Sequence, residues 1–495
     1  MVSTKNHLLR RIFLMGNIVS LLELLVKGLS EAELKFFENP KDFYSLESSV
    51  KSTTEEFAAK YLGLVLSSIN SQIKKDGWRK ENYKIHRNDK RTIITSVGDV
   101  VFESTYFKNK KGEYHYLTED MIGLSGHDRF SEGAEVMLLT EAMKTSYEEA
   151  TKVLPSKSKI TKTTVMNKVH GIAEELPEEI SEDKKKVKYL FIEADEDHVA
   201  EQHGRWSNKT DNRSFISKLA YVYEYKRESK KCRGKKELVN TFYFGGVYDD
   251  SKGVEKFWRN VDRFIVNNYE IDEIDKVYIS GDGAGWIKSG TSYVSKSVFC
   301  ADKFHLVKYI NKAANQMLDE SEIAKSEIYR LLYKRQRKNL REYLESMSRC
   351  ANNPEPIDAL KTYVLNNWNA VMLCLHEEIV DGCSAEGHIS SVLSDRLSSR
   401  PKGWSKTGAD RMSKLRCYER NYGRNKIIEL VKYSREKRQL QRTGTDDIPV
   451  RKLHLYEVVK EHKNKSRGYI DNIQATVPGM TTRKMFGIRN QIKLI

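Results

Sequence analysis

Residues 188–302 alternate short apolar runs with a single amphipathic helical segment, and few folds accommodate that order. The runs KYLFIEAD (188–195), KLAYVYEYK (218–226) and VNTFYFGG (239–246) predict a meander of three strands. The segment GVEKFWRNVDRFI (253–265) has helical spacing, and KVYISGD (276–282) and KSVFCAD (296–302) predict a fourth and a fifth strand. We therefore expect an α/β domain built on a mixed sheet.

Acids stand at the ends of two of these predicted strands. Asp195 ends the first strand and Asp282 ends the fourth, while Glu386 lies near the start of a predicted helix at 383–399. Three strands, a helix and two more strands is the order of an RNase H-like domain, in which strands one and four are neighbours. We expect the two aspartates to meet there, and a helix packed on the sheet to bring in Glu386.

Three carboxylates suit the cleavage of a phosphodiester. That reaction needs charge neutralised at the attacking and leaving oxygens, which two Mg²⁺ ions about 3.5–4 Å apart provide. Mg²⁺ prefers oxygen ligands, and Mn²⁺ is the alternative ion. We predict that Asp195, Asp282 and Glu386 are both the catalytic residues and the metal ligands. Asp197 is an alternative first ligand, but a ligand at a strand end is better fixed than one further into the loop.

The loop GDGAGW (281–286) behind the fourth strand has two interpretations. Its backbone could cradle phosphates, or it could expose a carboxylate at the strand end. A dinucleotide-binding loop needs G-x-G-x-x-G, which this spacing does not provide, and G-x-x-x-x-G-K-[ST] is absent from the chain. The glycines are more consistent with close approach of DNA or metal to Asp282.

The N-terminal third is predicted to be mostly helical. Apolar residues from Leu8 to Val26 step by three and four, which indicates a helix with a narrow seam that packs on its own core or on a second copy. Ser30 is predicted to cap a second helix, and 91–107 reads as a hairpin around Gly98. Helices near 146–155 and 160–176 fit either a helix-turn-helix or an ordinary helix pair. The candidate recognition residues are Lys162, Asn167 and Lys168.

The charge balance favours a polyanionic partner. Lys and Arg number 85 against 69 Asp and Glu, a formal net charge of +16, so nucleic acid is the first candidate. No apolar run reaches the length of a membrane span. None of the six cysteines forms a C-x-x-C pair, which argues against structural zinc and disulfides and favours a reducing cytoplasm. We expect a cytoplasmic, nucleoid-associated protein with no membrane partner.

Three stretches resemble a known family. FIEADEDHV (191–199), YISGDGAGWI (278–287) and 383–416, which begins CSAEGHISSVL, are similar to the ISLre-type insertion-sequence transposases, a bacterial DDE family. The resemblance implies an RNase H-like catalytic domain with a helical insertion before the final acid, and it places the triad on Asp195, Asp282 and Glu386. ADKFH (301–305) resembles the D-x-x-H signature of the related Mutator-like transposases, which implies accessory roles for Asp302 and His305.

The basic segment after 395 supplies further candidates for DNA contact. Its cations would serve phosphates near the active site or be solvated, and its tryptophan would stack on a base. These candidates are Arg396, Arg400, Lys402, Trp404 and Arg411.

These observations predict a fold class and a function. The fold is α/β, an RNase H-like mixed sheet interrupted by an all-α insertion, with an N-terminal helical and helix-turn-helix DNA-binding region. The function is a DNA transposase that binds insertion-sequence ends, cleaves strands with metal ions, joins them to target DNA and acts as a homo-oligomer on DNA. The alternatives are an RNase H-like nuclease or resolvase, or an inactive transposase-derived DNA-binding protein. The predicted regions are a helical, dimerising 1–85, a hairpin and helix-turn-helix 86–176, a linker 177–186, the core 187–302, the insertion 303–375, the second core part 376–420 and a basic tail 421–495.

Overall fold

The computed structural model describes residues 2–124, 128–178, 180, 182–202, 213–229, 234, 236–399 and 403–443, with side chains described from Ser20 to Gln441. The predicted basic tail lies outside these residues from 444 onward. The chain forms two compact units. The first is Met1–Ser131 with Pro155–Ser158 and Gln439–Ile495, and the second is Glu132–Leu154 with Lys159–Arg438. The hairpin and the helix pair, predicted as one region, therefore fall in different units.

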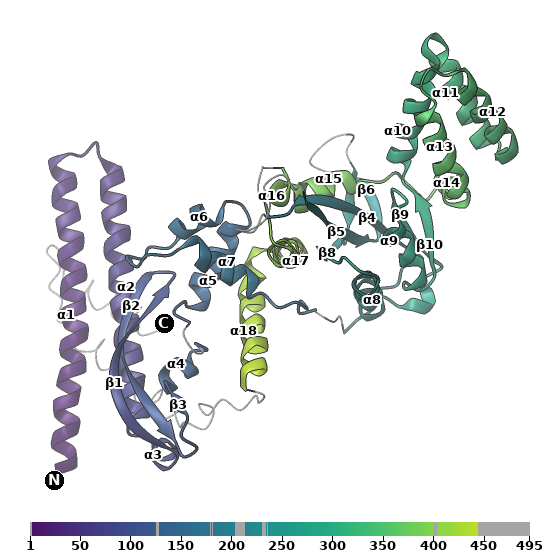
Figure 1. Ribbon diagram of the computed structural model, residues 1–495. Helices are drawn as coiled ribbons and strands as arrows, with labels where there is room; N and C mark the ends of the chain where they lie inside the picture. Colours follow the sequence, from purple (N-terminus) through teal and green to yellow (C-terminus); the bar gives the residue numbers. More distant parts are fainter. Residues whose placement is uncertain are drawn as a thin grey trace. The chain divides into compact units, whose positions relative to one another are not determined.

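The first unit opens with a pair of long helices, α1 (Val2–Glu38) and α2 (Phe43–Ile73) (Figure 1). Ser30 does not cap a new helix, because α1 runs through it without a break. The described face of α1 that packs on α2 includes Leu21 and Ala32, both buried. Leu22 and Val26 of the predicted seam are instead 46% and 61% exposed, so the seam does not pack on the chain's own core there.

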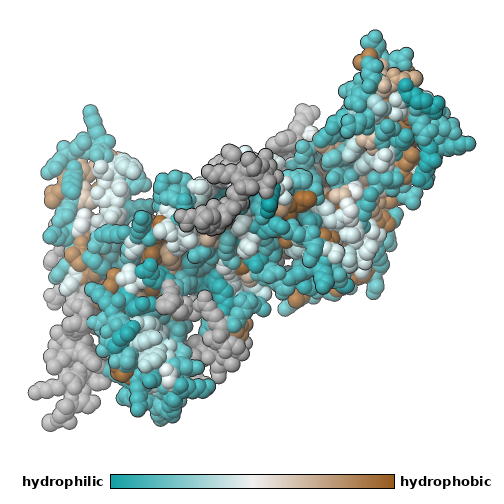
Figure 2. All heavy atoms as spheres, in the orientation of Figure 1, coloured by the Kyte–Doolittle hydropathy of each residue, from teal (hydrophilic) through white to brown (hydrophobic). Residues whose placement is uncertain are grey.

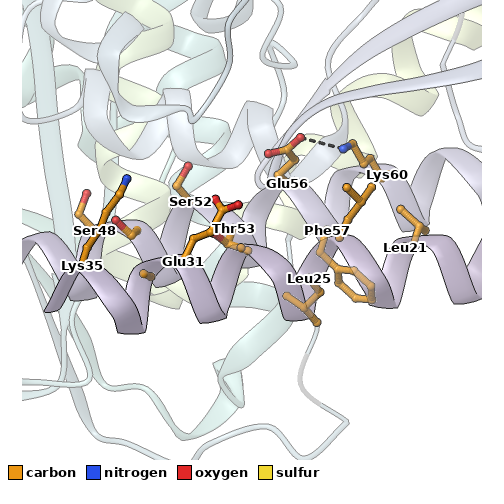
Figure 3. Close-up of a pocket in the computed structure, with 14 residues that line it drawn as sticks. Leu21, Leu25, Glu31, Lys35, Ser48, Ser52, Thr53, Glu56, Phe57 and Lys60 are labelled. Carbon is orange, nitrogen blue, oxygen red and sulfur yellow. Dashed lines mark ion pairs between the residues drawn. The ribbon is translucent and has the colours of Figure 1, made fainter. Parts of the chain in front are cut away.

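Between α1 and α2 lies a hollow of about 490 Å³ (Figure 3). Leu21, Leu25 and Phe57 form its apolar end, and the ion pair between Glu56 and Lys60 lies beside them, with nitrogen and oxygen 2.8 Å apart. Polar and charged residues, including Glu31, Lys35, three serines and Thr53, line much of the rest, so the contact between the two helices is apolar only in part.

A three-stranded sheet completes the first unit. The predicted hairpin is confirmed and is longer than expected, with β1 (Tyr83–Thr95) antiparallel to β2 (Gly98–Asn109). The short β3 (Tyr114–His115) pairs with the far end of β2. Apolar side chains from β1 and β2, including Ile93, Val100 and Phe102, pack with Ala59 and Leu66 of α2. Short helices flank the sheet: α3 (Gly77–Asn82) and α4 (Leu117–Met121).

The second unit contains a five-stranded mixed sheet in the order β10-β9-β4-β5-β8. The meander β4-β5-β8 is antiparallel, and β9 and β10 are parallel to β4. The first and fourth strands of the predicted order are thus neighbours, as expected. The strands are β4 (Tyr189–Ala200), β5 (Ser214–Tyr223), β8 (Phe242–Val247), β9 (Lys276–Gly281) and β10 (Ser297–Ala301). A separate pair, β6 (Tyr225–Glu228) and β7 (Lys236–Val239), was not predicted.

One face of this sheet is closed by α8 (Ser251–Asn268), whose apolar side is the predicted amphipathic segment. Phe257, Trp258 and Val261 of α8 pack against Ile192 and Ile279 in one buried core. The opposite face of β4 is contacted by α15 (Ala385–Ile389). This helix continues into a π-helical turn (Ser390–Ser394) and α16 (Asp395–Leu397).

Helices account for the remainder of the second unit. Those between β10 and α15 enclose a separate apolar core and are α10 (Lys303–Ala314), α11 (Ser321–Tyr333), α12 (Arg337–Cys350), α13 (Glu355–Asn366) and α14 (Trp368–His376). The others are α5 (Glu132–Ala142), α6 (Tyr147–Ala150), α7 (Lys162–His170), α9 (Gly285–Lys288), α17 (Lys406–Tyr422) and α18 (Ile427–Thr443). No described helix is long and apolar enough to cross a bilayer.

Candidate active site

The first predicted acid lies within a strand and not at its end. Because β4 continues to Ala200, residues of the same strand precede and follow Asp195. Side chains alternate along a strand, so Ile192 and Ala194 enter the core under α8 while Asp195 points to the other face, together with Glu193 and Asp197. The Oδ1 atom of Asp195 accepts a hydrogen bond of 2.8 Å from the backbone N–H of Glu196.

The loop after β9 explains why glycines surround the second acid. A Cβ atom on Gly281 would lie 2.7 Å from the carbonyl oxygen of Ala194 on β4, so only glycine lets the two strands approach this closely here. Gly283 has φ +96°, which disfavours other residues. Between them, Oδ1 of Asp282 accepts a 2.8 Å hydrogen bond from the N–H of Ala284. The glycines therefore place a carboxylate beside β4.

The accessory pair follows β10. Asp302 caps α10, and its Oδ1 accepts a 2.8 Å hydrogen bond from the N–H of Phe304. Its Oδ2 lies 2.6 Å from Nδ1 of His305, which donates to it when that nitrogen carries the proton. The Asp302 N–H donates to the carbonyl of Gly281 at 3.0 Å, which ties this pair to the loop that carries Asp282.

The electrostatics join these residues into one site. Burial raises the pKa of Asp195 to about 6; the negative charge of Asp282 adds to this rise, while the Glu196 N–H and His305 oppose it. The hydrogen bond to Asp302 raises the pKa of His305, against the effect of burial, and the charges of Asp195 and Asp282 contribute. His305 thus supplies part of the compensating positive charge, and burial and like charge outweigh it. The donor set of Asp195 and Asp282 therefore fits a hard divalent cation, for which each carboxylate keeps its Oδ2 oxygen available.

The third predicted acid is brought to the same face of the sheet but not into contact with the aspartates. Glu386 is exposed on α15, and no hydrogen bond or ion pair joins it to another described side chain. Across the described part of the chain, no three His, Cys, Asp or Glu side chains are grouped so that they could hold a metal ion. Convergence of all three carboxylates thus stays a prediction.

The sequence reasoning missed a buried carboxylate that holds α15 to the sheet. Glu193 is 1% exposed, and its Oε2 accepts hydrogen bonds from the N–H and hydroxyl of Ser384, at 2.7 and 2.9 Å. Its Oε1 lies 2.8 Å from Nζ of Lys226 and accepts a hydrogen bond from the Tyr223 hydroxyl, while the Tyr221 hydroxyl donates to Oε2. Burial disfavours its charge, but Lys226 and these hydroxyls hold the pKa of Glu193 below its usual value.

The signal for this network was visible in the sequence. FIEAD (191–195) places an acid inside an otherwise apolar strand, and a buried acid needs partners. The partners come from distant segments and cannot be identified from spacing alone.

Asp197, the alternative first ligand, is held to the chain through one carboxylate oxygen, while its buried Oδ2 has no hydrogen-bond partner among the described residues. Its Oδ1 accepts hydrogen bonds from the hydroxyls of Ser394 and Ser398, at 3.0 and 2.7 Å. These serines lie around α16, so Asp197 fixes the segment that follows the π-helical turn. The geometry favours Asp195 as the acid that faces Asp282.

The candidate recognition residues on α7 divide into two groups. Lys162 and Asn167 are exposed, and Thr161 caps the helix by accepting a hydrogen bond from the N–H of Thr164. Lys168 is buried, and its Nζ lies 3.2 Å from the carboxylate of Glu135. Lys168 therefore has a structural partner, and its predicted contact with DNA does not fit this placement.

The basic segment after α15 is also largely committed to the chain's own packing. Trp404 is 5% exposed and donates to the carbonyl of Leu397, so no free ring face remains for stacking on a base. Arg396 is buried with its guanidinium 4.6 Å from the Trp404 ring, and its Nε donates to Ala142. Arg411 pairs with Asp410. The placement corrects the predictions for Trp404 and Arg396. The remaining candidates, Arg400 and Lys402, lie outside the described residues.

Comparison with known proteins gives one family. The model of an uncharacterised protein family, UPF0236, matches residues 37–434. The UPF0236 protein TTE2489 of Caldanaerobacter subterraneus subsp. tengcongensis is 33% identical over 442 residues, 88% of this chain and 90% of the relative. A second relative in that organism, named for eleven loci from TTE0033 to TTE2212, is 33% identical over 451 residues, 90% of this chain and 91% of its own.

A more distant relative is the UPF0236 protein in the vanSb 3′ region of Streptococcus gallolyticus, 24% identical over 78% of this chain and 85% of its own. Among solved structures, the Drosophila P element transposase strand transfer complex matches 74% of this chain and 92% of that chain, with a TM-score of 0.22 and 12% identity. That score is too low to support an argument about fold or function. The family match and the relatives in Caldanaerobacter show that this chain belongs to the UPF0236 family.

Proposed function

We propose that this protein is a DNA transposase with an RNase H-like catalytic domain. It would bind the ends of its own mobile element, cleave the strands with Mg²⁺ and join the freed 3′ hydroxyls to target DNA. The observation that carries the proposal is the placement of Asp195 on β4 and of Asp282 directly after the neighbouring strand β9, in a sheet ordered β10-β9-β4-β5-β8.

The strand order supports the RNase H-like assignment. An antiparallel meander extended by parallel strands on one side, with a helix between the third and fourth strands, is the order expected from sequence. The elevated pKa of Asp195 adds support, since functional acids cluster where burial and like charge disfavour ionisation.

In the proposal, Asp195 and Asp282 hold Mg²⁺ and Glu386 joins them once DNA and metal are present. When bound, the metal would neutralise charge on the attacking and leaving oxygens of the phosphodiester. His305, held by Asp302, would orient the site or contact the DNA backbone. Lys162 and Asn167 on α7 would contact base edges at the element ends.

Two further observations are consistent with a mobile element. A net charge of +16 suits a protein that binds DNA. The second Caldanaerobacter relative, whose alignment covers 90% of this chain, carries a name that lists eleven loci of that organism. Presence at many loci of one genome is the expected result of transposition. Because two element ends must be held together, we also propose that the protein acts as a multimer on DNA.

The test is a reaction of the full chain with Mg²⁺ and a duplex that carries the border of the genetic element encoding it. The proposal predicts nicks at the border and products joined to a second, unlabelled duplex. Cleavage without joining would instead indicate a nuclease or resolvase. Binding without any cleavage, in Mg²⁺ or Mn²⁺, would indicate an inactive DNA-binding protein.

A further inference from the structure

One end of the three-stranded sheet in the first unit carries a layer of tyrosines and cations that the proposed function leaves unused. We call Lys84, Arg87, Tyr106, Lys108 and Tyr114 the tyrosine–lysine face. The strand register places them on one side: Lys84 lies opposite Lys108, Arg87 opposite Tyr106, and Lys108 opposite Tyr114. An irregularity in β1 between Ile85 and Arg87 allows Lys84 and Arg87 to share that side.

The tyrosine rings support one another and the cations. Tyr106 stacks on Tyr114 with ring centroids 5.1 Å apart, and Tyr116 packs 4.5 Å from Tyr106. The guanidinium of Arg87 lies 4.8 Å from the Tyr106 ring centroid, and Nζ of Lys108 lies 5.3 Å from that of Tyr114. The stacked rings help to hold the cations in place, while the Tyr114 side chain remains 41% exposed.

The positive charge of this face is only partly neutralised. Asp89 accepts hydrogen bonds from Arg87 and from the Tyr116 hydroxyl, at 2.8 and 2.5 Å. No carboxylate in the described part of the chain pairs with Lys84 or Lys108, and both side chains are exposed. From residue 83 to 116 the chain has seven Lys and Arg against four Asp and Glu, so the excess is positive. Hydrophilic residues make up most of the coloured surface in Figure 2.

From these features we propose that the tyrosine–lysine face binds the phosphate backbone of duplex DNA. Exposed cations without carboxylate partners are complementary to phosphates, and a two-stranded β-ribbon has a width that the major groove admits. The rings fix the cations before binding, which lowers the ordering cost of association. The inference rests on the proposed function in that it assigns a further contact to the same substrate, and it lies in a different unit from Asp195 and Asp282.

The test is the salt dependence of binding by the full chain to a random-sequence duplex of about 40 base pairs. Each phosphate contact contributes about 0.9 to the slope of log affinity against log salt. The double variant Lys84→Gln, Lys108→Gln should therefore lower that slope by about 1.8 and weaken binding at low salt. The matched control is Lys27→Gln, Lys51→Gln, which removes two charges from helices where the side chains are 74% exposed.

The outcomes separate this inference from the proposed function. A slope lowered in the first variant and unchanged in the control supports the face as a DNA contact. If both variants keep the wild-type slope, the inference about this face is overturned. The proposed function is then still tested separately, by cleavage of border DNA. Stronger loss of binding to single-stranded than to duplex DNA would also overturn the inference. Unchanged thermal unfolding of the double variant serves as the folding check, and Arg87→Gln provides a second, independent substitution.

Discussion

At the scale of single residues, the candidate site contains two partly buried aspartates, Asp195 and Asp282. In both Asp195 and Asp282, one carboxylate oxygen accepts a hydrogen bond from a neighbouring backbone N–H, and this bond fixes the direction of the second oxygen. Glu193, two residues before Asp195 on the same face, is fully compensated by Lys226, two tyrosines and Ser384. Glu193 is thus satisfied by partners within the chain, whereas in the proposal the partner of Asp195 is the metal ion.

The raised pKa of Asp195 predicts a pH-dependent effect on stability. Its folded-state value of about 6 lies above the ordinary 3.8, so ionisation destabilises the folded state as pH rises through this interval. Asp195→Asn should therefore be more stable than wild type at pH 7.5 in EDTA, by up to about 3 kcal/mol, and equal to it at pH below about 4. Urea unfolding at both pH values measures this difference. Equal stability at pH 7.5 would show that the carboxylate is well solvated.

A second residue-scale prediction concerns Glu193 as a positioning residue. Glu193→Gln leaves Lys226 without its buried partner and loosens Ser384, at a cost of about 3–5 kcal/mol in unfolding free energy. Because α15 carries Glu386, we also expect a higher Mg²⁺ concentration for half-maximal border cleavage, with DNA binding unchanged.

The control for this variant is Lys185→Gln, which breaks the more exposed pair with Glu224 and should cost about 0–1 kcal/mol. A Glu193→Gln protein that is destabilised but has the wild-type Mg²⁺ dependence would limit Glu193 to a structural role.

At the scale of elements, the sequence predicted the five-stranded sheet well because its strands are short apolar runs separated by polar loops. The order of those runs, with a helix between the third and fourth, was enough to make β4 and β9 neighbours. The extension of β4 to Ala200 was not predictable, since EDHVA (196–200) begins with charged residues that favour a loop, and pairing with β5 holds it in the strand.

Contacts between distant segments account for the failed predictions. Arg396 and Trp404 lie in a basic run typical of a solvated loop, yet they are buried by bonds to Ala142 and Leu397. Similarly, α1 continues through Ser30 because packing against α2 outweighs a local capping signal. Local patterns carry no information about such partners.

The helix α7 gives a prediction at this scale. Lys162 and Asn167 are its exposed candidates, so replacing either with Ala should weaken binding to element ends more than binding to random DNA, by about 1–3 kcal/mol for a base-edge contact. Paired gel-shift titrations on the two duplexes measure the difference. Lys168→Ala is the informative comparison, because its partner Glu135 predicts a loss of stability without a change in discrimination. Equal losses on both duplexes would remove α7 as a recognition helix.

At the scale of the whole molecule, our proposals place DNA contacts in both units. The second unit contains the paired aspartates, α15 and α7, and the first contains the tyrosine–lysine face. A chain that both binds element ends and cleaves strands would use the DNA contacts of both units. This division explains why substitutions at the acids are expected to leave binding intact.

The most direct test of the central claim is Mg²⁺-dependent cleavage of border DNA by four single variants of the full chain. Asp195→Ala, Asp282→Ala and Glu386→Ala should each lose detectable cleavage while retaining border binding, because the acids serve the metals and not DNA recognition. Glu378→Ala, an exposed acid eight residues before Glu386, should cleave as wild type does. Near-normal cleavage by any of the first three variants would contradict the proposed active site.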